Sequence, residues 1–152
     1  MKNLRMKYFD LSPELMSGFR AVKVALEKSV VDQNLIELVY LRVSQINGCA
    51  YCLNLHTNSL LKAGETQRRI SEVAGWRVSD QFSKKEQAAL NWAEQLTLIS
   101  TSHADDESFE LLKNFFNDTE ISDLTFAISL MNGMNRLAIS MRAMRCIMGN
   151  VE

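Results

Sequence analysis

The sequence has little proline, little glycine and few cysteines. One proline, Pro13, and six glycines among 152 residues leave few positions that would interrupt a helix. Apolar residues recur at helical spacing and not in the alternation that is typical of strands. We therefore expect an all-α protein. Because 47% of the residues are hydrophobic and the length suits one core, we predict a single domain over residues 1–152.

Excess charge, basic tracts and long apolar runs are also lacking. Seventeen basic residues stand against eighteen acidic ones, so we expect neither nucleic acid nor an anionic membrane as a partner. No stretch approaches the ~18 apolar residues of a membrane span, and the first residues lack the apolar run of a signal peptide. We expect a cytoplasmic protein. Three cysteines, two of them three residues apart, do not form a secreted disulfide framework and are more typical of catalysis or metal binding.

Capping residues and glycines divide the chain into helices. The helix after Asp32 is apolar on most sides and is expected to be buried. The first helix is expected to face the core with Leu15 and Leu26, and the helix that begins near Ser83 is expected to continue to Ile99. Helix starts are expected at Ser12-Pro13-Glu14, Asp32, Ser83-Lys84-Lys85-Glu86, Ser102 or Asp105, and Asp118 or Thr119, with helix ends at Asn47-Gly48, Gly64 and Gly75.

Four residues stand in the spacing E-x11-C-x2-C-x3-H: Glu37, Cys49, Cys52 and His56. The two cysteines and the histidine fall at i, i+3 and i+7, on one face of a helix. Near a helix start, unpaired N–H groups and the macrodipole favour thiolate over thiol. Cysteines at this spacing can also close a disulfide, so the pair can cycle between dithiol and disulfide. By the same spacing Tyr51 points away from the cysteines, although it can still reach a bound ligand.

Glu37 lies on the preceding helix. If the two helices pack antiparallel, Glu37 is ~16 Å and His56 ~12 Å from the turn at Gly48, so the two side chains are nearly level. A carboxylate in so apolar a helix needs a partner, and the imidazole is the natural one, with Arg42 as the alternative. A paired carboxylate and imidazole can take a proton from a thiol and return it to a leaving group.

A structural zinc site is a competing interpretation of the same residues. Cys49, Cys52 and His56 would provide three ligands, with His103 or Cys146 as the fourth. Three ligands on one helix face depart from the usual spacing of such sites, so we do not expect a metal. His103 and Cys146 are more typical of structural positions.

The signature resembles that of the AhpD-like alkylhydroperoxidases in the carboxymuconolactone decarboxylase superfamily. The resemblance covers most of the chain from Leu35 onward, through AGWRVSDQFSKKEQAALNWAEQLTLIS and LTFAISLMNGMNRLAISM, with Asn132, Asn135 and Arg136. It implies a multi-helix fold with the CxxC at the N-terminus of a core helix, and thiol-dependent reduction of hydroperoxides. It also implies a trimer or hexamer, a thiol or lipoyl-type reductant, and no cofactor. The methionine-rich last helix fits a subunit interface.

By the family pattern Cys52 attacks the peroxide, Cys49 resolves the sulfenic acid as a disulfide, and Glu37 and His56 relay protons. The dipole by itself favours Cys49 as the more acidic thiol. The AhpD proteins proper carry a histidine where this chain has Tyr51. Two other functions compete with the peroxidase: a protein thiol-disulfide oxidoreductase or redox sensor, and a non-enzymatic metal-binding oligomer.

Overall fold

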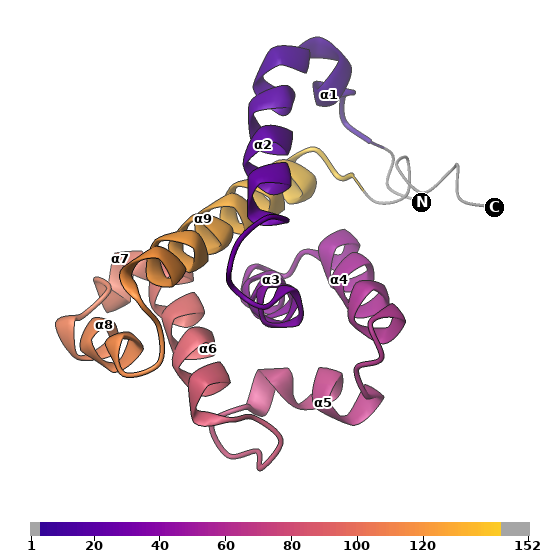
Figure 1. Ribbon diagram of the computed structural model, residues 1–152. Coiled ribbons are helices and arrows are strands. Elements are labelled where there is room, and N and C mark those ends of the chain that lie inside the picture. The colour runs from indigo at the N-terminus through magenta and orange to yellow at the C-terminus, as the bar shows by residue number, and fades with distance from the viewer. Residues whose placement is uncertain (1–3, 144–152) are drawn as a thin grey trace.

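The computed structural model describes residues 4–143, and every regular element in that range is a helix (Figure 1). The predicted all-α fold is confirmed. Across the described range, no helix combines the length and apolar character needed to cross a membrane. In chain order the elements are α1 (Tyr8–Leu11), α2 (Pro13–Leu26), α3 (Gln33–Asn47), α4 (Ala50–Lys62), α5 (Gln67–Glu72), the 3-10 helix η1 (Val73–Gly75), α6 (Lys84–Thr97), α7 (Ile99–Ser102), α8 (Asp106–Lys113) and α9 (Asp118–Ser140).

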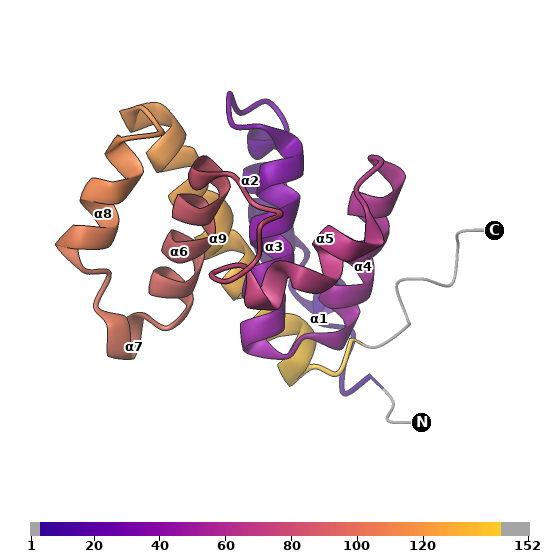
Figure 2. The ribbon, with the colours of Figure 1, turned by 90° about the horizontal axis from the view of Figure 1, so that it is seen from below.

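The buried helix α3 is the centre of the fold. It contacts α4 on one side and α6 and α9 on the other, as Figures 1 and 2 show. The Asp32 side chain caps it by accepting from the Leu35 N–H at 3.0 Å. It ends at Gly48, whose φ of 70° lies in the left-handed region that favours glycine. This turn leads directly into α4 and places the two cysteines at the start of that helix.

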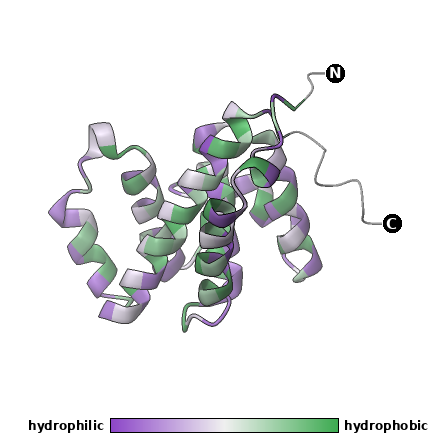
Figure 3. Ribbon diagram, turned by 90° about the horizontal axis from the view of Figure 1, so that it is seen from above, coloured by the Kyte–Doolittle hydropathy of each residue, from purple (hydrophilic) through white to green (hydrophobic). Residues whose placement is uncertain are grey.

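Two hydrophobic clusters meet across α3. The larger cluster packs α2, α3, α6, α8 and α9 together, and Val39, Ala93 and Ile128 are fully buried in it. The second cluster packs α4, α5 and η1 against the other side of α3, around Leu60 and Leu90. Figure 3 shows the apolar residues on the helix faces that turn toward one another. Helices α3 and α6 therefore contribute to both clusters.

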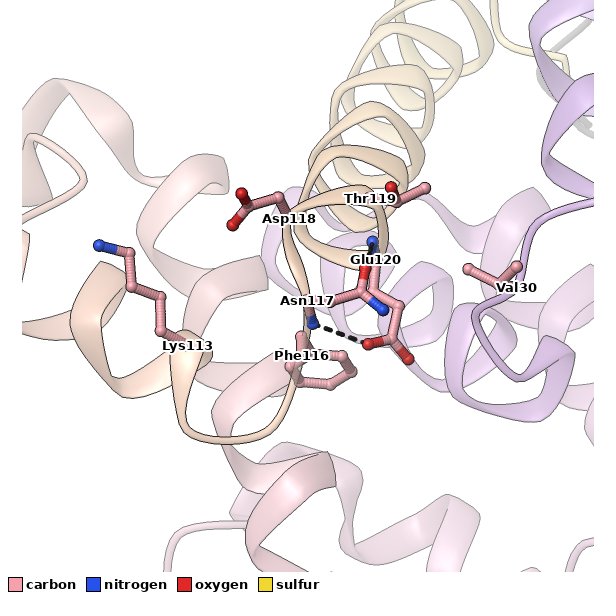
Figure 4. A pocket seen from close by; sticks show the side chains of 7 residues that line it. All are labelled: Val30, Lys113, Phe116, Asn117, Asp118, Thr119 and Glu120. Atoms are coloured by element: carbon pink, nitrogen blue, oxygen red, sulfur yellow. Dashed lines mark hydrogen bonds between the residues drawn. The ribbon is translucent and has the colours of Figure 1, made fainter.

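Helix α9 begins one residue earlier than the sequence predicts. Its N-cap is Asn117, and neither Asp118 nor Thr119 fills that position. The Asn117 side chain accepts from the Glu120 N–H at 3.0 Å, and the Glu120 carboxylate accepts from the Asn117 N–H at 2.8 Å (Figure 4). An asparagine with a glutamate three residues later thus forms a capping box. Ser83 and Glu86 form the same capping box at the start of α6, as the sequence predicts.

Four other expectations need correction or completion. Leu15 is 72% exposed, and Met16 takes its place on the inward face of α2, whereas Leu26 is buried as expected. Ile99 is exposed and belongs to α7, since the backbone at Leu98 leaves the helical conformation and ends α6 at Thr97. Gly75 closes the short 3-10 helix η1 that follows α5. Of the two candidate caps for α8, the structure uses Asp105.

Glu94 ties three elements together. Its carboxylate accepts from the Trp76 indole N–H at 2.8 Å and lies 2.8 Å from the Arg42 guanidinium and 2.6 Å from that of Arg77. Although burial alone would raise it, these hydrogen bonds and charges lower the pKa of Glu94. Trp76 and Glu94, which both lie in the segment AGWRVSDQFSKKEQAALNWAEQLTLIS, are thus in direct contact, and together with Arg42 they hold α6 against η1 and α3.

Candidate redox-active cysteine site

The two cysteines sit at the start of α4. Cys49 is the N-cap and Cys52 lies in the first turn, where its N–H points at the Cys49 sulfur with an N···S distance of 3.4 Å. Their sulfurs are bonded as a disulfide, and the two Cα atoms are 5.3 Å apart. Both residues are buried, with 1% and 4% of their surface exposed. The N–H contact and the helix terminus favour negative charge on the Cys49 sulfur when the bond is reduced.

Glu37 and His56 meet across the groove between α3 and α4. The His56 Nδ1 lies 2.8 Å from the Glu37 carboxylate, so the predicted pairing is present. Arg42, the alternative partner, pairs with Glu94 instead. A neutral imidazole that donates from Nδ1 to an ionised carboxylate carries its lone pair on Nε2. The His56 Nε2 is buried and has no hydrogen-bond partner among the described residues, so it is the atom available for proton exchange.

Tyr40 covers the histidine from the side of α3. Its ring centroid lies 5.1 Å from that of His56, and the residue is 3% exposed. Burial, followed by the negative charge of Glu37, raises the pKa of Tyr40 well above its usual range. Tyr40 therefore stays neutral and provides an apolar wall for the imidazole.

A cavity of about 370 Å³ opens beside the cysteine pair, enclosed by α1, α2, α3, α4 and α9. Cys52 and His56 line it, whereas Cys49 and Glu37 are not among its lining residues. A small molecule in the cavity therefore reaches one cysteine and the histidine, and the other two signature residues stand behind them. The remaining lining residues are Tyr8, Phe9, Met16, Phe19, Arg20, Lys23, Tyr40, Tyr51, Leu55, Leu130, Met131, Met134 and Ala138.

Tyr51 does not point away from the cysteines, because it packs against their cluster. It lines the cavity that Cys52 lines, which fits the expectation that it can reach a bound ligand. The first turn of α4 is surrounded by α1 and the end of α9, and Tyr51 packs in the small cluster that Tyr8 and both cysteines form there. Burial raises the pKa of Tyr51, and burial together with the charge of Tyr51 raises that of Tyr8. Both hydroxyls therefore remain protonated at neutral pH and can donate hydrogen bonds into the cavity.

Of the two residues named as the fourth ligand of a zinc site, His103 lies far from the cysteine pair. Among residues 4–143, no group of three or more His, Cys, Asp or Glu side chains is placed to hold a metal ion. His103 is an exposed residue at the end of α7, on the opposite side of the molecule from α4 (Figure 1). Cys146, Met144 and Met148 lie outside the described residues.

Sequence reasoning did not find most of the cavity wall. Arg20, Phe19, Leu130 and Met134 come from helices far apart in the chain, and no motif links them. The sequence pattern that could have identified part of this wall lies on α2. There, one helix face carries residues at the spacing i, i+3, i+4, i+7: Met16, Phe19, Arg20 and Lys23.

Fold and site together define a small helical protein with a buried cysteine pair and a carboxylate-bound histidine beside an apolar cavity. The model of the carboxymuconolactone decarboxylase family matches residues 12–95 of this chain. That is more than half of its length, so the chain belongs to this family. Within the family it is AhpD-like, as its relatives indicate.

Three relatives illustrate this. The Bacillus subtilis protein YdfG, which is uncharacterized, is 34% identical over 90% of this chain and 93% of its own. The solved structure of ATU0492 from Agrobacterium tumefaciens, a protein of unknown function provisionally assigned to antioxidant defence as AhpD, superposes with a TM-score of 0.89 at 33% identity and covers 93% of this chain and 97% of its own. The alkyl hydroperoxide reductase AhpD of Coxiella burnetii is 44% identical over a shorter stretch, 28% of this chain and 24% of its own.

Proposed function

We propose that this protein is a thiol peroxidase that reduces organic hydroperoxides through Cys52. The observation that carries the proposal is that Cys52 and His56 line one largely apolar cavity while Glu37 binds the far side of the imidazole. A nucleophile, a proton carrier and an apolar binding space therefore adjoin one another. The AhpD-like relatives point to the same chemistry.

The first step forms a sulfenic acid. With the pair reduced, the His56 Nε2 takes the proton of Cys52, and the thiolate attacks the terminal oxygen of the hydroperoxide. A sulfur–oxygen bond forms, the oxygen–oxygen bond breaks, and the alkoxide leaves as the alcohol after it takes the proton back from His56. Glu37 stabilises the charged imidazolium between the two transfers.

The second step uses the position of Cys49. Its thiolate, stabilised by the Cys52 N–H and the helix terminus, attacks the sulfur of the Cys52 sulfenic acid. The disulfide forms and hydroxide leaves as water once it is protonated. The stabilised thiolate suits Cys49 to the resolving role, so the effect of the helix dipole on Cys49 is compatible with attack on the peroxide by Cys52.

An external dithiol must then return two electrons. The reductant has to reach Cys52 through the cavity, since Cys49 is not exposed to it. Attack there releases Cys49, the thiolate that the helix terminus stabilises and hence the better leaving group. A small thiol or a slender lipoyl-type arm fits this route. The burial of both sulfurs disfavours the alternative of a protein thiol-disulfide oxidoreductase, whose partner must bring its own cysteine onto the pair.

Stopped-flow mixing of the reduced protein with cumene hydroperoxide tests the proposal. We expect one equivalent to be consumed per dithiol, no consumption by Cys52→Ser, and consumption by Cys49→Ser that halts at a sulfenic acid on Cys52, trapped with dimedone and located by mass spectrometry. Cys146→Ser is the matched control and should match the parent protein. Consumption no faster than that of free cysteine, or full activity in Cys52→Ser, overturns the proposal.

We also propose that the protein works as a homo-oligomer, a trimer or hexamer as the family resemblance implies. Several large apolar side chains lie on the surface, among them Val30 at 69% and Phe126 at 61% exposure. The α9 methionines Met131 and Met134 face the cavity and so do not contribute to that surface. Light scattering should give a mass of three or six chains; the mass of one chain contradicts this proposal.

A further inference from the structure

The cavity beside Cys52 carries charge of one sign only. Its charged lining residues are Arg20 and Lys23, both on α2, and no aspartate or glutamate lines it. Glu37 is turned toward His56 behind the wall. An anionic ligand therefore meets two cations and no opposing carboxylate inside this cavity.

The two cations differ in what they already bind. The Lys23 ammonium lies 2.7 Å from the Glu27 carboxylate, one turn along α2, in a pair whose side chains are both more than half exposed. Arg20 has no ion pair or hydrogen bond within residues 4–143 and is exposed. A guanidinium presents a planar fork of donors that matches a carboxylate with two parallel hydrogen bonds. Arg20 is thus the free anion-binding group of the cavity.

The rest of the wall selects an apolar body. Phe9, Phe19, Leu55, Leu130 and Met134 line the same cavity as the two cations and Cys52. The methionine thioether and the aromatic faces adapt to the shape of a flexible chain. A volume of about 370 Å³ lies within the range of small-molecule sites and far exceeds what hydrogen peroxide needs.

From this arrangement we infer the substrate class: a long-chain organic hydroperoxide that carries a carboxylate, with the carboxylate on Arg20, the chain along the apolar wall and the peroxide at Cys52. The inference rests on the proposed peroxidase function and specifies its substrate. Helix α2 provides both kinds of contact that this substrate needs. Arg20 lies next to Phe19 on the part of the helix that borders the cavity, so one residue can bind the carboxylate and the other can contact the chain.

Two measurements test the inference. In the first, kcat/KM is measured for 13-hydroperoxyoctadecadienoate and for its methyl ester, both below the concentration at which micelles form. The free acid should be turned over roughly 10-fold more efficiently, as expected for a charge-assisted pair. Arg20→Gln should reduce kcat/KM for the acid to the level of the ester. Lys28→Gln, an exposed cation that does not line the cavity, is the matched control.

The second measurement does not depend on turnover. Calorimetry with the oxidised protein measures the affinity for 13-hydroxyoctadecadienoate, the product alcohol, and for its methyl ester. Tighter binding of the acid that is lost in Arg20→Gln supports the inference; equal binding of acid and ester, or binding unaffected by Arg20→Gln, overturns it. Absence of any peroxide turnover instead overturns the proposed function, so the two failures are distinguishable.

Discussion

At the scale of single residues, the site depends on which atoms of each side chain are engaged. His56 uses Nδ1 for the Glu37 carboxylate and keeps Nε2 free, while Cys49 uses its sulfur to accept the Cys52 N–H. Of the residues in these two contacts, Cys52 and His56 line the cavity. The proposed roles of Cys52 as the attacking thiol and Cys49 as the resolving thiol therefore follow from their positions at the start of α4, since the two side chains are chemically identical.

The charge of Glu37 is the first residue-scale prediction. Glu37→Gln keeps an oxygen that can accept from the His56 Nδ1–H but removes the charge that stabilises the imidazolium. We expect peroxide consumption to slow by roughly 10- to 100-fold with little loss of stability. Stopped-flow rates from pH 5 to 9 provide the measurement, and Glu110→Gln, an exposed glutamate on α8, is the control. An unchanged rate and pH profile would remove Glu37 from the proton relay.

At the scale of elements, Glu94 joins α6 to α3 and η1. Because its pKa is lowered in the folded protein, the ionised form stabilises the fold above its ordinary pKa of 4.5, and this contribution is lost as the pH falls through the lower folded value. Glu94→Gln should cost about 2 kcal/mol in the free energy of unfolding at pH 7. Urea denaturation should show the gap between variant and parent closing below pH 4.5. A gap that stays constant down to pH 3 would contradict this linkage.

The packing of α2 on α9 is set by Gly133. A Cβ atom at this position would lie 2.8 Å from the Cε1 of Phe19, whose ring lines the cavity. Gly133→Ala should displace that ring, lowering kcat/KM for bulky hydroperoxides while leaving hydrogen peroxide unaffected. The gain in helix propensity of up to about 1 kcal/mol offsets the cost in stability.

Two variants make the test of Gly133 specific. Adding Phe19→Leu to Gly133→Ala should restore the rate with bulky substrates, because the shorter side chain gives the new methyl group room. Gly18→Ala, where a Cβ meets nothing within 4 Å, should stabilise α2 by about 1 kcal/mol with no effect on activity. Equal effects of the two alanine substitutions on activity would argue against a role for the Phe19 contact.

The elements were largely predictable, and the cavity was not. Helix starts at Asp32 and Ser83 and the turn at Gly48 follow from local capping chemistry, and the rise per residue along a helix sufficed to place Glu37 level with His56. The cavity wall depends on how α1, α2 and α9 close over α4, which no local pattern encodes. For the same reason Tyr51 was placed on the wrong side, since helical spacing says nothing about what covers the first turn.

At the scale of the whole molecule, a polar network runs through the junction of the three central helices. Asn135, which is fully buried, donates to the Ser44 hydroxyl at 3.2 Å and accepts from the Asn47 side chain at 3.0 Å. Asn47 also donates to Asn132, which in turn donates to Thr97 on α6. The network thus joins α3, α6 and α9 at the end of α3 that leads into the cysteines.

This network predicts a link between global stability and the site. Asn135→Ala leaves the Asn47 amide and the Ser44 hydroxyl short of a buried partner, so we expect a loss of about 2 to 3 kcal/mol in the free energy of unfolding. The exposed Asn58→Ala on α4 is the control and should be neutral or slightly stabilising.

A double-mutant cycle measures how far the network acts as one unit. Asn47→Ala and Asn135→Ala share a direct hydrogen bond, so in urea denaturation their costs should differ from additivity by more than about 0.5 kcal/mol. Because Asn47 precedes the Gly48 turn, each variant should also slow the attack of Cys52 on cumene hydroperoxide under conditions where the protein remains folded. Additive costs, or full peroxidase rates in both variants, would mean that α3 positions the cysteine pair through its apolar packing alone.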